Sequence, residues 1–189
     1  MSRRISLAVA AAVLSLVSAG AASAHDHSPR PVEVGGAPMY ADKTIVQNAV
    51  NSRDHTTLVA AVQAAGLVDT LNGPGPFTVF APTNAAFAKL PAGTVDTLLK
   101  PENKPTLTKI LTAHVVPGRI TAEQLVAQIR AGNGRASLTT VSGDTLTASL
   151  HGSMVHVTDE KGGVAMVTIA DVLQSNGVIH VVDGVLLPN

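Results

Sequence analysis

Histidine is the residue type of this 189-residue chain that is best suited to chemistry, because the sequence contains seven histidines and no cysteine. The most suggestive spacing is His25-Asp26-His27, which follows directly after Ala24. If the chain is cleaved after Ala24, the new amine, two backbone amide nitrogens and the imidazole of His27 form a square-planar set of ligands. Such a set suits Cu(II) or Ni(II). The sequence therefore predicts that His25, Asp26 and His27 form a metal-binding N-terminus in the cleaved chain.

Two further histidines, His151 and His156, flank the Gly152-Ser153 turn of a predicted hairpin. In a two-residue hairpin they would be diagonal neighbours on one face, about 7–8 Å apart. A metal site there would need further ligands, and the sequence alone identifies none.

His114 and His180 lie in apolar surroundings. His114 continues the apolar stripe of a predicted helix, after Ile110 and Leu111, and His180 lies inside an apolar strand. Both positions favour a buried imidazole that hydrogen-bonds to the backbone.

The sequence contains no motif of nucleophilic or metal-assisted catalysis. It has no Gly-x-Ser-x-Gly elbow and no His-Glu-x-x-His pair. The turn 72–76 superficially resembles a phosphate loop, but Pro74 and Pro76 lack the N–H groups that such a loop directs at phosphate. The other polar residues are scattered along the chain. We therefore predict a protein that is not an enzyme, and we identify no cofactor.

The first 24 residues have the pattern of a secretory signal peptide. Arg3 and Arg4 precede the apolar run 5–17, and small residues occupy 22–24. Without the two arginines, 11 basic residues face 13 acidic ones and no basic patch stands out, which argues against nucleic acid as a partner. We expect a monomer with no membrane span after signal removal, located in the periplasm or outside the cell.

The chain after residue 24 divides into an arm and a domain. Proline, glycine and polar residues make 25–38 a predicted flexible arm, and 39–189 is predicted to be one domain. Asp42 and Asp54 are predicted to cap the first two helices, and Thr121 with Gln124 has the spacing of a capping box. After residue 134 the apolar period falls to 2. The predicted strands there are 136–141, 145–150, 154–158, 164–170 and 178–187.

The segment 75–90 organises the domain. Residues 77–81 predict a strand that carries large apolar side chains on both faces, so this strand should lie between two layers. Pro82 ends it, and Thr83 fits the N-cap of a short helix that contains Phe87.

This segment resembles the first signature motif of the fasciclin domain family, in which a strand runs through Ala-Pro-Thr-Asn into a helix that contains Phe. The segment 176–188, Asn-Gly-Val-Ile-His-Val-Val-Asp-Gly-Val-Leu-Leu-Pro, resembles the second signature motif. The resemblance covers roughly 39–188. It implies an α+β fold, a fasciclin-like wedge of two small β-sheets with helices packed on one side. The structural signature comprises Thr78, Phe80, Pro82, Thr83, Asn84, Phe87, Asn176, Gly177, His180 and Asp183.

The resemblance also implies where a partner could bind. Adhesive animal members carry a Tyr-His pair at the place of Ala113-His114, and some carry Pro-Asp-Ile-Met at the place of 170–173. Here His114 and Asp171 match, Val172 is a near match, and Leu173 replaces Met. His114, Asp171, Val172 and Leu173 are therefore the candidate partner-binding residues.

Two functions remain open from the sequence. The first is an exported, non-enzymatic adhesion or interaction module that acts at the cell surface or in the extracellular matrix. It would bind a surface or matrix protein, or a glycan, through its loops. The second is a periplasmic protein that binds a small ligand, or Cu(II) or Ni(II), through the His arm or through a pocket between helices and sheet.

Overall fold

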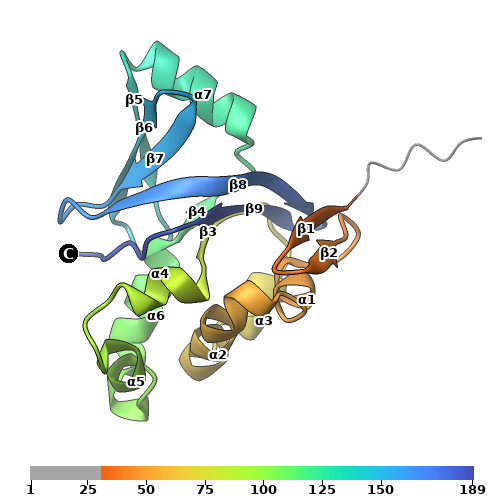
Figure 1. Ribbon diagram of the computed structural model, residues 1–189, viewed down its shortest axis with the longest axis vertical. Helices are drawn as coiled ribbons and strands as arrows, with labels where there is room; N and C mark the ends of the chain where they lie inside the picture. Colours follow the sequence, from red (N-terminus) through yellow and green to blue (C-terminus); the bar gives the residue numbers. More distant parts are fainter. Residues whose placement is uncertain (1–30) are drawn as a thin grey trace, which may run out of the picture. The chain divides into compact units, whose positions relative to one another are not determined.

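A computed structural model describes residues 31–189 of the chain (Figure 1). The predicted signal peptide and the predicted metal-binding set, His25, Asp26 and His27, lie outside the described residues. Within the described part, no helix is long and apolar enough to span a bilayer.

The domain begins with a hairpin of β1 (Val32–Val34) and β2 (Ala37–Met39). Val34 and Met39 are each only 4% exposed, because they pack into the core. The prediction of a flexible arm over 25–38 is therefore wrong for its last part. The apolar residues of 32–39 alternate in the way that a strand requires, and the prolines and glycines between them obscured this pattern.

The helices are short and follow one another closely along the first two thirds of the chain. They are α1 (Ile45–Ala49), α2 (Thr56–Ala65), α3 (Val68–Asn72), α4 (Asn84–Ala88), α5 (Thr94–Leu98), α6 (Lys104–Ala113) and α7 (Ala122–Ala131), with 3-10 turns at Arg53–His55 and Pro101–Asn103. Thr83 and Thr121 cap α4 and α7 as predicted. The prediction for Asp42 is wrong, because Thr44 caps α1 through a capping box with Gln47.

Seven strands form one continuous order, β4-β3-β9-β8-β7-β6-β5. Their bounds are β3 (Phe77–Pro82), β4 (Val115–Pro117), β5 (Arg135–Thr139), β6 (Thr145–His151), β7 (Met154–Thr158), β8 (Val164–Gln174) and β9 (Gly177–Val182). The Phe-bearing β3 pairs in parallel with β9, so the two signature segments lie side by side, with Phe80 opposite His180. The two signature segments therefore meet inside one body.

Strand β8 joins the two halves of the strand order. It pairs with β9 at one end and with β7 at the other, and its register to β9 shifts between Val167 and Val172. Asp171 lies in this irregular stretch with φ +57°, a left-handed conformation. The two small sheets of the predicted α+β wedge therefore share one long, bent strand (Figure 1).

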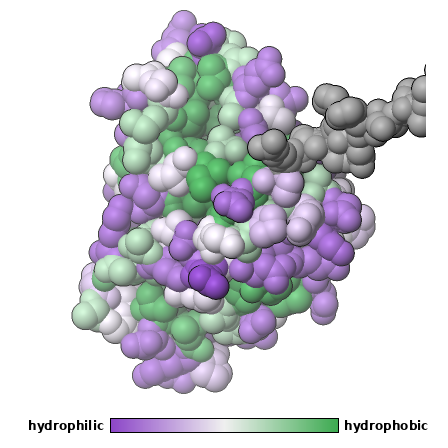
Figure 2. All heavy atoms as spheres, turned by 45° about the vertical axis from the view of Figure 1, so that its right-hand side comes forward, coloured by the Kyte–Doolittle hydropathy of each residue, from purple (hydrophilic) through white to green (hydrophobic). Residues whose placement is uncertain are grey.

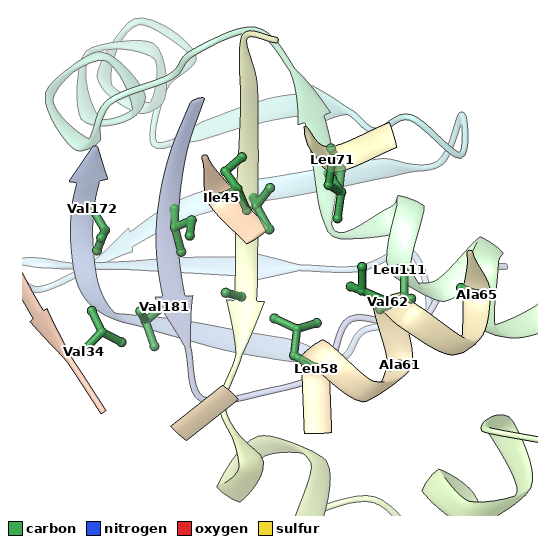
Figure 3. Close-up of a cluster of buried hydrophobic side chains, with 14 of the residues drawn as sticks. Val34, Ile45, Leu58, Ala61, Val62, Ala65, Leu71, Leu111, Val172 and Val181 are labelled. Carbon is green, nitrogen blue, oxygen red and sulfur yellow. The ribbon is translucent and has the colours of Figure 1, made fainter. Parts of the chain in front are cut away.

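The central strands separate two apolar clusters. Val79 and Ala81 of β3 face the first cluster, which packs against α1, α2, α3 and α6 (Figure 3). Phe80 faces the second cluster, which is built by α7 and the inner faces of β5, β6 and β7. The alternation predicted for β3 is confirmed. Helix α7 is the exception to packing on one side, because it covers the second cluster.

Candidate functional site

His114 is a fully paired core residue. It is 2% exposed, its Nδ1 lies 2.8 Å from the carbonyl oxygen of Ile110, and its Nε2 accepts a hydrogen bond of 2.9 Å from the N–H of Leu186. An acceptor Nε2 requires a neutral ring with its proton on Nδ1. Burial accordingly lowers the pKa of His114 to about 4. The predicted burial of the imidazole and its bond to the backbone are confirmed, and this side chain offers no surface to a partner.

His180 is held in the same manner by different elements. Its Nε2 donates to the carbonyl of Ile120 at 2.8 Å, and its Nδ1 accepts from the N–H of Asp171 at 3.3 Å. Its ring stacks on Phe80 at 5.7 Å between centroids. Burial lowers its pKa, so the ring is neutral and fixes the loop before α7 to the bend of β8.

The polar signature residues bond mainly to the backbone. Asn176 accepts from the N–H of Ile45 and donates to the carbonyl of Leu71, and Asn84 accepts from the N–H of Thr57. The hydroxyl of Thr78 donates to the carbonyl of Gly118 at 2.6 Å. These side chains tie distant loops together. They leave few polar atoms for a ligand.

Asp183 and Gly177 act on the strands themselves. Asp183 accepts from the N–H of Met166 at 2.8 Å and pairs with Lys89 at 3.2 Å. Partial burial opposes its ionisation, but these donors together lower the pKa of Asp183. A Cβ on Gly177 would lie 2.2 Å from the carbonyl oxygen of Phe77, so only glycine permits β9 to approach β3 so closely.

The predicted partner-binding stretch divides into buried and exposed residues. Val172 is 1% exposed and Leu173 is 41% exposed. Asp171 is half-buried, and its Oδ1 accepts a hydrogen bond of 2.7 Å from the N–H of Ala122, the first residue of α7. Asp171 therefore supports the start of α7, and Leu173 is the apolar side chain of this stretch that faces solvent.

Two exposed residues that the sequence did not single out, Arg119 and Tyr40, belong to segments that are hydrogen-bonded to the backbone at the end of β8. Arg119 donates from Nη2 to the carbonyl of Gln174 at 2.9 Å. The loop that carries Tyr40 is joined to the end of β8 by the bond from the N–H of Ser175 to the carbonyl of Lys43. Tyr40 is 48% exposed. It is the only tyrosine of the chain, and this is the signal in the sequence that could have identified it as a candidate binding residue. We call Tyr40, Arg119, Asp171 and Leu173 the β8-end surface.

Apolar side chains also reach the outside elsewhere. Figure 2 views the molecule with the side of β1 and β2 brought forward, and apolar groups lie there among polar ones. Exposed large apolar residues include Val50, Val141, Met154 and Val164.

A small apolar cavity of about 70 Å³ lies under the helices. Side chains of α1, α2, α3, α6 and β3 line it, among them Ile45, Val62, Leu71, Val79 and Leu111. Its walls present almost no polar atoms. Over residues 31–189, no three side chains of His, Cys, Asp or Glu come together as a metal site.

The fasciclin domain model matches residues 53–188, which include both signature segments and the paired strands β3 and β9. The chain belongs to the fasciclin domain family. The fasciclin signature is therefore explained by the bonds above, which assemble the fold.

Two named bacterial proteins resemble most of this chain. Protein sll1483 of Synechocystis sp. is 53% identical over 145 residues, which are 77% of this chain and 73% of that protein. The immunogenic protein MPB70 of Mycobacterium bovis is 38% identical over 184 residues, which are 94% of this chain and 85% of that protein.

A solved structure has the same fold. The FAS1 domain pair of the insect cell adhesion molecule fasciclin I superposes with a TM-score of 0.67 at 20% identity, over 77% of this chain and 51% of that one. This likeness shows that the α+β arrangement of Figure 1 is the fasciclin fold.

Proposed function

We propose that this fasciclin domain is an exported, non-enzymatic adhesion or interaction module that acts at the cell surface or in the extracellular matrix. It binds a surface or matrix protein, or a glycan, through the β8-end surface. The observation that carries the proposal is an exposed apolar side chain, Leu173, directly before Gln174 and Ser175, to which Arg119 and the loop of Tyr40 are hydrogen-bonded. Membership in a family that includes a cell adhesion molecule supports the same class of function.

The chemistry of the β8-end surface suits a macromolecular partner. Tyrosine and arginine are enriched among the residues that dominate binding interfaces. The guanidinium of Arg119 is anchored by Gln174, and the backbone of Asp171 is anchored by His180. An anchored side chain loses less conformational entropy on binding than a free one, which favours affinity.

The test is capture of a partner from an envelope extract on immobilised protein, followed by measurement of its affinity. Leu173→Ser and Tyr40→Ala should each weaken binding by about tenfold or more if these side chains are contact residues. Val164→Ser is the matched control, because Val164 is 54% exposed on another part of β8. Equal losses in Leu173→Ser and Val164→Ser would contradict the proposed surface.

Asp171 needs a substitution that preserves the fold. Asp171→Asn keeps an oxygen for the N–H of Ala122 and removes only the charge. Weaker binding by this variant, with unchanged stability, would assign the carboxylate to the partner rather than to α7.

The cavity favours a second candidate, a binding protein for small apolar molecules. An unfilled cavity of this size costs on the order of 2 kcal/mol of stability, part of which an apolar occupant recovers. Short alkanols should then raise the melting temperature of the protein, and Ala49→Leu, which fills the space, should abolish the rise. No rise in the unaltered protein would exclude this candidate. The Cu(II) or Ni(II) site predicted at His25, Asp26 and His27 remains a separate proposal.

A further inference from the structure

The outer face of the β6-β7-β8 meander gathers four side chains that can bind a soft metal ion. In the register of the sheet, His151 lies opposite Met154, and His156 lies opposite Met166. Directly opposed residues of an antiparallel pair share a face, and so do residues two apart on one strand, such as Met154 and His156. All four side chains therefore lie on the same face.

This face points away from the core. The intervening residues Leu146, Ala148, Val155, Val157 and Ala165 are buried in the second cluster. His151 and Met154 are exposed, and His156 and Met166 are half-buried. An ion arriving from solvent therefore reaches the four side chains without opening the fold.

His156 is the centre of the group. Its ring stacks on that of His151 with 5.2 Å between the centroids, Met166 is its partner on β8, and Met154 is two residues before it on β7. Its Nε2 is buried and has no hydrogen-bond partner. Buried polar atoms are almost always paired, so an unpaired imidazole nitrogen beside two thioethers calls for an explanation.

His55 provides a contrast within the same domain. Its Nε2 is also unpaired, but it lines a small cavity of aliphatic side chains with one methionine, Met39, and its Nδ1 contacts the hydroxyl of Ser52. No second imidazole lines that cavity. The outer face of the meander therefore combines two imidazoles with two thioethers, whereas the cavity at His55 has one of each.

We propose that His151, Met154, His156 and Met166 form a binding site for Cu(I). Thioether sulfur selects soft ions such as Cu(I), and imidazole also suits copper. The set offers four neutral ligands and no carboxylate, which disfavours hard ions such as Mg²⁺ and Ca²⁺. Rotation of the two histidine rings out of their stack brings their nitrogens toward one ion. The site is distinct from the predicted Cu(II) or Ni(II) set at the N-terminus, which contains no sulfur.

The test uses the purified chain that begins at His25 and carries His27→Ala, so that the predicted N-terminal set contributes nothing. The protein competes anaerobically for Cu(I) with a chromophoric chelator, and the expected result is removal of one Cu(I) per chain. His156→Ala and the pair Met154→Leu/Met166→Leu should each weaken the affinity by at least about tenfold, whereas Met39→Leu should not change it. No removal of copper from the chelator, or equal affinity in the double leucine variant, would overturn the proposal.

A second measurement on the unaltered ligands does not depend on how the variants fold. With ¹³C-methyl methionine, one equivalent of Ag(I), a redox-inert analogue of Cu(I), should shift the signals of Met154 and Met166 and leave that of Met39 in place. Unmoved signals for Met154 and Met166 would also overturn the proposal, as would a site that holds Zn²⁺ as tightly as Cu(I).

Discussion

The β3-β9 pair and the outer face of the β6-β7-β8 meander use polar residues in opposite ways. At β3 and β9, His180, Thr78 and Asn176 are surrounded by backbone groups that they pair with. On the meander, His156 keeps an unpaired nitrogen, and its neighbours are side chains rather than backbone. The signature of the family therefore marks residues that hold the fold, and the residues free to bind lie where no signature is found.

The largest effect should come from breaking the central pair. Phe80 of β3 is fully buried within the second cluster, so Phe80→Ala should cost about 3–5 kcal/mol of unfolding free energy. Urea unfolding followed by circular dichroism measures this. A loss no larger than that of Val164→Ala, on the exposed outer face, would contradict the assignment of the core.

The buried histidines should make the stability of the domain depend on pH. The pKa of His114 is about 4 in the folded state and near 6.5 in the unfolded state, so the unfolded state binds more protons as the pH falls. Stability is fully present above pH 6.5 and decreases toward pH 4, by on the order of 3 kcal/mol for His114 at about 1.4 kcal/mol per pKa unit. His180 and His55 act in the same direction.

Unfolding free energies measured from pH 7 to 4 check this slope. His114→Gln should lower the stability at pH 7 and make the slope shallower, because one of the titrating groups is gone. An unchanged slope in His114→Gln would show that other groups control the acid sensitivity.

A smaller effect should come from the bend of β8. Asp171→Ala removes the acceptor for the N–H of Ala122 and places alanine at φ +57°, which should cost about 1–2 kcal/mol. Asp171→Asn should cost less, because asparagine tolerates this backbone conformation and keeps an acceptor oxygen. Thermal unfolding of the two variants side by side distinguishes them, and equal losses would place the cost in the charge alone.

The smallest effect should come from the outer face of the meander. Met154→Leu and Met166→Leu conserve volume at solvent-facing positions, so each should change the unfolding free energy by less than about 0.5 kcal/mol. The same two changes are the ones expected to weaken Cu(I) binding. A large loss of stability from either would mean that this face is structural, like β3 and β9, and the contrast between the two regions would fail.

Local signals in the sequence predicted local structure well. The caps at Thr83 and Thr121 were predictable because the capping residue and its partner are three residues apart. The burial of His114 and His180 followed from the apolar residues around each. The prediction that Asp42 caps the first helix was wrong because Thr44, two residues later, forms a capping box with Gln47.

Features that depend on long-range pairing could not be predicted. The left-handed conformation of Asp171 exists because β8 must bend between two partner strands, and its bond to Ala122 spans 49 residues. Likewise, Met166 becomes a neighbour of His156 only through the register of β7 and β8. Spacing along the chain predicted that the two histidines are neighbours, but it could not predict which methionine side chains the sheet would place beside them.

The parallel pairing of β3 with β9 has a consequence for synthesis. Phe77 and its partner Gly177 are one hundred residues apart. A ribosome adds about 5–20 residues each second, so β3 waits some 5–20 s before its neighbour exists. During this interval the apolar side chains on both faces of β3 are uncovered. A chaperone that holds the chain, or passage through a translocon, is then needed to prevent aggregation.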